Sequence, residues 1–240
     1  MPVTAYNCLV KSINFITPTV FELRFITDQP LEFKAGQFIS IVIPGAGPKG
    51  RDLRRAYSIA SPPERSPIEL CITYVEGGPG STYLRNLKEG DIFKGFAPYG
   101  TFVYQPHPEK NLMFISTGTG LAPFRAMLLS HDFQKNPPRQ VISVFGVRHE
   151  SELLYQEDFS GKERVQWIPC ISRPSAEWRG FRGRVTDYLK TLPVDFPWTQ
   201  TDYYLCGNGA MIDEVKTLLI NRDVEKAAIF QEAYFKPPKH

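Results

Sequence analysis

The segment Arg55-Ala56-Tyr57-Ser58 places three different functional groups within four residues. A guanidinium can pair with a phosphate, a phenol can cover the face of an aromatic ring, and a hydroxyl can hydrogen-bond to a ring nitrogen. In a strand, Arg55 and Tyr57 would share one face because successive side chains alternate. The segment is therefore suited to a phosphorylated ring system such as a flavin, although an ordinary exposed strand would also explain these four residues.

A glycine-containing segment, Gly77–Thr82, follows an apolar run and precedes a short helical pattern. The free main-chain N–H groups of a helix start bind phosphate, and the hydroxyls of Ser81 and Thr82 could add hydrogen bonds. The alternative is a flexible turn that precedes a helix over 81–87, with Ser81 as its N-cap. The segment is therefore a candidate phosphate site.

A second segment of this kind, Thr117–Pro123, follows an apolar run and opens a helical pattern. Its two glycines would let the main chain approach a pyrophosphate, and Pro123 suits the first helical turn. The third glycine of the usual dinucleotide fingerprint is absent, so a turn without a ligand is the alternative. The flanking strand and helix favour a nucleotide. Two phosphate sites in different halves of the chain predict a flavin in one half and a nicotinamide nucleotide in the other.

Cys206-Gly207-Asn208 ends the last apolar run, where ligands bind at the edge of a parallel sheet. Gly207 would leave space for a flat ring, and Cys206 offers a small polarisable side chain. A lone cysteine at a strand end is usually an ordinary buried residue, which is the alternative here. The position of the segment and the Gly-Asn-Gly turn that follows the cysteine make it a candidate for binding a flat ring.

Ser172-Arg173 follows another apolar run, and its guanidinium could hold a phosphate through two parallel hydrogen bonds. Three more arginines, Arg179, Arg182 and Arg184, follow in the same turn-rich stretch. A solvated basic loop would explain any one of them. Together they favour a cofactor with a 2′-phosphate.

The composition is that of a globular protein with no affinity for nucleic acid. The chain has 240 residues, of which 42% are hydrophobic and 22% charged, enough for two domains. A net charge of +3 without a run of Lys or Arg excludes a phosphate-tracking stripe, but a local basic patch could dock a small acidic protein.

The four cysteines lie too far apart for an iron–sulfur cluster or a close-spaced zinc site, so no metal is expected. The chain shows neither a signal-peptide pattern nor an apolar run of about 18 residues, so we expect a cytoplasmic protein without a membrane span.

Hydrophobic periodicity changes at the linker Gln105–Pro108. Before it, the chain shows short alternating or β-branched runs that are separated by turn signals, such as Phe38–Ile43 and Ile68–Val75. These runs predict a closed antiparallel barrel. After it, apolar runs at 112–115, 141–145, 165–171 and 203–205 alternate with helical patterns at 123–131, 153–159, 185–192 and 210–222. That alternation predicts an α/β domain with a mostly parallel sheet. The predicted domains are residues 1–106 and 107–240.

With these motifs in this order, the chain resembles the ferredoxin–NADP⁺ reductase superfamily over essentially its whole length. The motifs that carry the resemblance are Arg55–Ser58, Gly78–Ser81, Thr117–Pro123, Cys206–Asn208 and the C-terminal Glu232-Ala233-Tyr234. The resemblance implies an N-terminal six-stranded antiparallel β-barrel that binds FAD and a C-terminal α/β domain that binds NADP. The chain departs from the family pattern at two places. It continues past Tyr234, so Phe235 could share the role of Tyr234, and Thr73 stands where plant-type members carry a basic residue.

The resemblance also implies roles for individual residues. Arg55 would bind flavin phosphate, Tyr57 would cover the isoalloxazine, and Ser58 would lie at its N5 edge. Cys206 and Glu232 would flank the nicotinamide, and Tyr234 would occupy the face where it must stack, so that Ser58, Cys206, Glu232 and Tyr234 form the expected catalytic set. The other expected cofactor contacts are Cys71, Ile72, Thr73, Gly80, Ser81, Thr82, Thr117, Gly118, Thr119, Gly120, Pro123, Ser172, Arg173, Gly207 and Asn208.

These implications predict an FAD-dependent enzyme that takes hydride from NADPH and passes single electrons to a ferredoxin or flavodoxin, acting as a monomer. One alternative is an NADH-dependent reductase component of an oxygenase, or a free flavin reductase. A second, of another class, is a non-catalytic flavin- or nucleotide-binding subunit that regulates a partner. The Tyr57, Cys206 and Glu232 side chains favour an enzyme, since a regulator needs no arrangement for hydride transfer.

Overall fold

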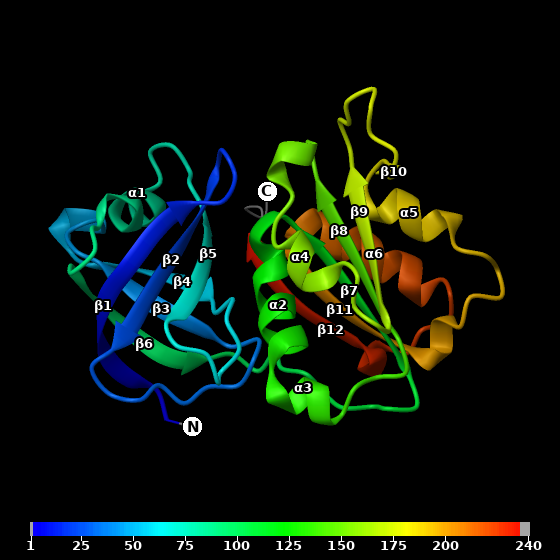
Figure 1. The fold of residues 1–240 in the computed structure, drawn as a ribbon, viewed down its shortest axis with the longest axis horizontal. Coiled ribbons are helices and arrows are strands. Elements are labelled where there is room, and N and C mark those ends of the chain that lie inside the picture. Colours follow the sequence, from blue (N-terminus) through cyan, green and yellow to red (C-terminus); the bar gives the residue numbers. More distant parts are fainter. Residues whose placement is uncertain (1, 236–240) are drawn as a thin grey trace. The chain divides into compact units, whose positions relative to one another are not determined.

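The computed structural model describes residues 2–235, without the side chain of Phe235. The chain forms two compact units, each built around its own six-stranded sheet (Figure 1). The first unit contains the chain up to Tyr104 together with Ala122–Asp132. The second contains Gln105–Leu121 and the chain from Phe133 onward. The helix that follows the Thr117–Leu121 segment therefore belongs by its contacts to the first unit.

The first unit contains an antiparallel sheet in the order β4-β3-β6-β1-β2-β5. After β4 the chain meets β5 through the bridge Ile59↔Leu70, and Ala60 N–H donates to Glu69 O at 2.8 Å, so the curled sheet closes on itself. The predicted six-stranded antiparallel sheet is confirmed. Its strands are β1 (Thr4–Phe15), β2 (Val20–Thr27), β3 (Phe38–Ile43), β4 (Leu53–Ser58), β5 (Ile68–Thr73) and β6 (Ile92–Tyr99).

The alternation of buried and half-exposed side chains along a strand explains how these strands form a core. In β3, Ile39, Ile41 and Ile43 are buried while the residues between them are half-exposed, as period-2 packing requires. The helices of this unit are α1 (Pro79–Asn86) and α2 (Ala122–Leu129), and α3 (His131–Lys135) begins in it. The predicted N-cap of α1 was wrong. Gly78 is the N-cap and Ser81 lies inside the first turn, because Pro79 already takes the position where its missing N–H costs nothing.

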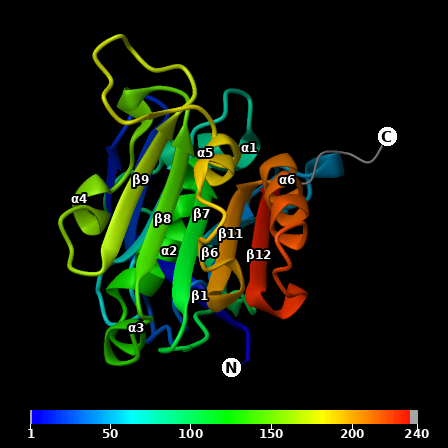
Figure 2. The same ribbon diagram turned by 90° about the vertical axis from the view of Figure 1, so that its right-hand side faces the viewer.

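The second unit contains a parallel sheet in the order β10-β9-β8-β7-β11-β12, which confirms the predicted α/β architecture. Figure 2 shows helices α5 and α6 in front of this sheet. Met113, Ile115, Tyr203 and Leu205 pack in one core with apolar residues of these two helices. The strands are β7 (Asn111–Thr117), β8 (Val141–Val147), β9 (Val165–Ile171), β10 (Phe181–Arg182), β11 (Thr201–Asn208) and β12 (Ile229–Phe235), and the helices are α4 (Gln156–Phe159), α5 (Val185–Thr191) and α6 (Gly209–Ile220).

Candidate functional site

In the first unit, the predicted flavin residues of β4 lie directly against the start of α1. A Cβ added to Gly80 would lie 2.6 Å from the Tyr57 hydroxyl and 3.0 Å from Arg55 Cγ, so a larger residue there would require the Tyr57 side chain to shift. Arg55 and Tyr57 pair with Ile41 and Ile39 of β3 and share one face of the sheet. Two motifs about 25 residues apart in sequence are therefore brought together, as one cofactor site would need.

The two side chains differ in the chemistry they offer. Burial raises the pKa of Tyr57 to about 12, although the positive charge of Arg55 acts against this shift, so the phenol remains protonated near neutral pH and can donate a hydrogen bond. Arg55 is exposed, and its Nη1 donates to the Arg54 carbonyl at 3.1 Å. The guanidinium retains further N–H donors for an anion. This pair fits the phosphate and the ring of a flavin nucleotide.

The Ser81 hydroxyl is engaged with its own loop. Val75 N–H donates to Ser81 Oγ at 3.0 Å, and the hydroxyl lies 3.2 Å from Val75 O and 3.4 Å from Gly78 O. These bonds hold the turn that leads into α1, whose Gly78 N-cap provides no side-chain hydrogen bond. The first-turn main-chain N–H groups, rather than the Ser81 hydroxyl, are therefore the donors this structure offers to a phosphate. Thr82 lies in the same turn and is half-buried.

The other predicted flavin contacts lie in β4 and β5, the two strands between which the curled sheet closes. Ser58 is buried at the end of β4, where it pairs with Phe38. Cys71 and Ile72 are buried in β5, with Ile72 in the core of the barrel, so Ile72 can reach a cofactor only through its main chain. Thr73 is exposed at the end of β5.

In the second unit, the Thr117–Gly120 and Cys206–Asn208 segments are packed against each other. A Cβ added to Gly120 would overlap the Cys206 carbonyl, and one added to Gly207, whose φ is 136°, would overlap the Thr117 side chain. Asn208 N–H donates to Thr117 Oγ1 at 3.1 Å. Gly120 and Gly207 are thus required by this close packing whether or not a nucleotide is bound.

Asn208 also has a structural role at the start of α6. Its Oδ1 accepts hydrogen bonds from the N–H groups of Ala210 at 2.9 Å and Met211 at 3.4 Å, which makes it the N-cap. Gly118 has a φ of 53°, and a Cβ there would meet no atom. Pro123 lies in the first turn of α2, as predicted, and groups with the first unit. Thr119 lies in the short 3₁₀ turn that joins β7 to α2.

Cys206, Glu232 and Tyr234 form a cluster at the carboxyl end of the parallel sheet. Cys206 of β11 is in register with Glu232 of β12, so their side chains share one face. Cys206 is fully buried, and burial raises the pKa of its thiol well above the usual value; the Glu232 charge raises it further, while a hydrogen bond with Tyr234 acts in the opposite direction. The thiol therefore stays neutral and is hydrogen-bonded to the Tyr234 side chain.

A bulge in β12 accounts for the position of Tyr234. Gly207 is in register with Ala233, but the next residue of β11, Asn208, is in register with Phe235, which leaves Tyr234 as an extra residue. Bulges re-aim side chains at strand ends, and here the effect is to direct the phenol to Cys206. The Phe235 side chain lies outside the described residues, so the alternative that Phe235 is the covering ring remains a prediction.

The loops after β8 and β9 contain the predicted phosphate arginine. Ser172 and Arg173 are exposed, and their N–H groups donate to the carbonyls of Val147 and Arg148 at 3.1 and 2.8 Å. Arg182, in contrast, donates to the carbonyls of Ser175, Ala176 and Trp178 at 2.8–3.0 Å and so shapes the loop.

The Glu150 carboxylate is held against this basic loop. Glu150 Oε1 accepts a hydrogen bond from Ser175 N–H at 2.8 Å. Main-chain hydrogen bonds, from its own N–H and from that of Ser175, lower the pKa of Glu150. It is therefore an anion held beside the loop that carries Arg173.

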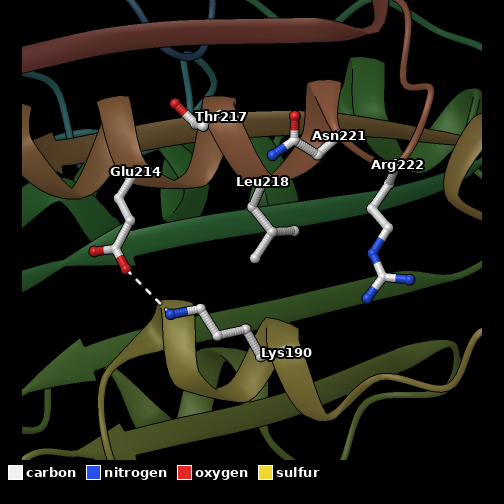
Figure 3. A pocket seen from close by; sticks show the side chains of 6 residues that line it. All are labelled: Lys190, Glu214, Thr217, Leu218, Asn221 and Arg222. Atoms are coloured by element: carbon white, nitrogen blue, oxygen red, sulfur yellow. Dashed lines mark hydrogen bonds and ion pairs between the residues drawn. The ribbon is translucent and has the colours of Figure 1, made fainter.

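A surface hollow of about 470 Å³ lies between α5 and α6, and none of the predicted site residues lines it (Figure 3). An ion pair of 3.4 Å between Lys190 and Glu214 crosses it. It is lined by Lys190, Glu214, Thr217, Leu218, Asn221 and Arg222.

The sequence reasoning missed a buried ionic cluster in the first unit. Arg125 of α2 is 5% exposed and donates to Glu69 Oε2 at 2.5 Å and to Ala60 O at 3.0 Å. Glu69 of β5 is 3% exposed and is also paired with Arg24 and Arg65, at 3.4 and 3.8 Å. The signal was a single arginine within an otherwise apolar helical pattern, which is unusual unless the charge is paired.

Comparison with known proteins agrees with the two-unit architecture. Residues 7–104 match the family model described as an oxidoreductase FAD-binding domain, and residues 114–217 match the oxidoreductase NAD-binding domain. Ferredoxin–NADP reductase B of Sorangium cellulosum is 32% identical over 224 residues, which cover 89% of this chain and 90% of that protein. The reductase component of phenol 2-monooxygenase from a Pseudomonas species is 31% identical over 98% of this chain and 67% of its own length.

Solved structures show the same fold. A ferredoxin NADP⁺ reductase from Neisseria gonorrhoeae, determined with bound FAD and NADP, superimposes with a TM-score of 0.82 at 22% identity and covers 98% of this chain and 100% of its own. No helix among residues 2–235 has the length and apolar character needed to span a membrane.

The fold and the two motif sets define a flavin-dependent oxidoreductase with one FAD-binding unit and one unit for a nicotinamide nucleotide. The chain belongs to the ferredoxin–NADP⁺ reductase family. The predicted family, enzyme class and pair of cofactors are thereby confirmed.

Proposed function

We propose that this enzyme oxidises NADPH and passes the electrons one at a time to a ferredoxin or flavodoxin. The observation that carries the proposal is the neutral, buried Cys206 thiol, which lies beside Glu232 and is hydrogen-bonded to Tyr234. A small uncharged group that is fully buried suits the stacking of a nicotinamide ring. FAD, when bound, would supply the conversion between two-electron and one-electron transfer.

The residues of the first unit would bind and orient the flavin. Arg55 and the first-turn N–H groups of α1 would hold its phosphates, and Tyr57 would lie against its ring. Ser58 would lie at the N5 edge. Gly80 permits this arrangement because a side chain at this position would displace the Tyr57 hydroxyl.

The residues of the second unit would orient the nicotinamide nucleotide. The Thr117–Gly120 turn would receive the pyrophosphate, and Cys206 and Glu232 would flank the nicotinamide ring. Tyr234 is hydrogen-bonded to the thiol in this structure, so its side chain would have to move to admit the ring. These residues therefore position the donor, and none of them needs to form a covalent bond with it.

Arg173 supports NADPH as the donor because its exposed guanidinium can bind a 2′-phosphate. Relatives named as ferredoxin–NADP reductases, including those of Azotobacter vinelandii and Pseudomonas aeruginosa at 33% and 34% identity, point the same way. We also propose that the protein works as a monomer, which light scattering after size-exclusion chromatography would test.

A second candidate is an NADH-dependent reductase component of an oxygenase. One specific observation favours it: the ionised Glu150 carboxylate, fixed by Ser175 N–H beside the Arg173 loop, would repel a 2′-phosphate and could accept a hydrogen bond from a ribose hydroxyl. Relatives that are electron-transfer components of monooxygenases and dioxygenases also support it.

One anaerobic titration separates these functions. The FAD-loaded protein is mixed with NADPH or NADH in increments, and flavin absorbance is followed. We expect NADPH to bleach the flavin at lower concentration than NADH, and subsequent addition of an oxidised ferredoxin or flavodoxin to restore the absorbance. A preference for NADH would support the oxygenase component. Flavin that stays oxidised with both donors would refute the enzyme and leave a binding subunit.

A further inference from the structure

Two serine hydroxyls in the second unit are buried without a hydrogen-bonding partner. Among the described residues, the unpartnered buried side-chain atoms are the hydroxyls of Ser116 and Ser143 and two tryptophan N–H groups. Both serines are 0% exposed. A buried hydroxyl without a partner costs about 1–3 kcal/mol relative to one that is bonded, so each needs an explanation.

The position of Ser116 connects it to the Cys206 cluster. Ser116 of β7 is in register with Cys206 of β11, which is in register with Glu232 of β12. Residues in register on neighbouring parallel strands direct their side chains to the same face. Ser116, Cys206 and Glu232 therefore form one row across three adjacent strands at the carboxyl end of the sheet.

Ser143 is a natural control for Ser116. It lies on β8 in register with Phe114, two residues before Ser116 on β7, so it faces the same side of the same sheet. It is equally buried and equally unpartnered. The difference is its place: Ser143 is one level further from the carboxyl end and has no register contact with Cys206 or Glu232.

We propose that Ser116 is part of the nicotinamide site and that its hydroxyl hydrogen-bonds to the carboxamide of the nicotinamide ring. This inference rests on the proposed function, in which the ring lies beside Cys206. The carboxamide is the ring's one hydrogen-bonding substituent and both donates and accepts, as the serine hydroxyl does. In this structure Cys206 and Ser116 are both fully covered, so the movement of Tyr234 that admits the ring to Cys206 would also bring its carboxamide to the next side chain in the row.

The test compares Ser116→Ala and Ser143→Ala in a Tyr234→Ser background, where the phenol no longer competes for the site. Each FAD-loaded protein is titrated by calorimetry with NADP⁺, and with 2′,5′-ADP, which lacks the nicotinamide. Melting temperatures are recorded without nucleotide.

We expect Ser116→Ala to weaken NADP⁺ binding about 3- to 10-fold, the usual loss for one neutral hydrogen bond, and to leave 2′,5′-ADP binding unchanged. Ser143→Ala should change neither affinity. Both variants should melt at or above the temperature of their parent, because each removes an unpartnered hydroxyl.

Equal NADP⁺ affinity in all three proteins would overturn the inference and would assign both hydroxyls to buried water. An equal loss for 2′,5′-ADP in the Ser116 variant would also overturn it, since that loss could not come from the carboxamide. Failure of the proposed function is seen separately, as flavin that NADPH does not bleach in the unmodified protein. If the flavin is bleached and only the Ser116 effect is missing, the proposed function stands and this inference fails.

Discussion

Replacing Arg125 by methionine should destabilise the first unit strongly. The side chain is 5% exposed, and it donates to the Glu69 carboxylate and to the Ala60 carbonyl across the point where the barrel closes. Methionine keeps the apolar part of the side chain but leaves Glu69, which is 3% exposed, without its shortest ionic contact. Removal of one partner from a buried ion pair typically costs about 3–5 kcal/mol.

The remaining partners of Glu69 reduce that cost. Arg24 and Arg65 stay within 3.4 and 3.8 Å of the carboxylate, but both are 43% exposed and so compensate weakly. We therefore expect Arg125→Met to lower the free energy of unfolding by about 2–4 kcal/mol. Urea denaturation monitored by far-UV circular dichroism, with flavin fluorescence as a second probe, measures this change.

Two control variants make the result interpretable. Arg65→Met removes an exposed ion pair with the same carboxylate and should cost less than about 1 kcal/mol. The double variant Arg125→Met/Glu69→Leu removes both charges and should recover much of the loss, since a buried apolar pair replaces a buried ionic one at little net cost. A loss below about 1 kcal/mol for Arg125→Met, or no recovery in the double variant, would refute this reasoning.

The remaining predictions concern the two cofactor sites and the buried thiols. Arg55→Ala should weaken FAD binding by about 1.5–3 kcal/mol, measured as flavin retained on dilution, and full retention at low protein concentration would contradict the phosphate contact. Arg173→Ala should raise KM mainly for NADPH; an equal rise with NADH would exclude selection of the 2′-phosphate. Tyr234→Ser should tighten NADP⁺ binding and reduce discrimination against NAD⁺, and if only Phe235→Ser does so and brightens the flavin, the covering ring is Phe235. The free energy of unfolding should fall as pH rises above about 9, because burial raises the pKa of the Cys8 and Cys170 thiols to about 12 while thiols of the unfolded chain ionise near 9.0. Urea denaturation at pH 8, 9 and 10 would measure this change.

The strands were the part of the fold that the sequence predicted best. The β-branched run Phe38–Ile43 predicted β3, and the apolar run 165–171 predicted β9, in each case with both ends in place. The helix starts were harder, as Ser81 shows. A serine before a helical pattern resembles an N-cap, but the proline two residues earlier had already begun the helix. Local signals of this kind compete, and a single sequence does not show which one prevails.

The candidate site could be predicted where a motif is contiguous. Arg55 and Tyr57, and likewise Cys206 and Asn208, are recognisable because their neighbours in sequence are their neighbours in space. Ser116 could not be found in this way, since its significance depends on register with Cys206, 90 positions later in the chain. Arg182 shows the opposite difficulty: a guanidinium in a basic loop suggests a phosphate ligand, yet its donors are bound to three carbonyls.

The extra residue at the end of β12 bears on how fast the proposed nicotinamide site can open. The main chain on either side of Tyr234 is anchored, with Ala233 in register with Gly207 and Phe235 in register with Asn208. The phenol can therefore swing through the torsions of a single residue, without peeling the strand from the sheet. Motions of that size take roughly nanoseconds to microseconds, whereas typical turnover takes about a millisecond to a second. Opening at Tyr234 would then be in rapid equilibrium, and the ring would influence how tightly the nucleotide binds while setting no limit on the rate.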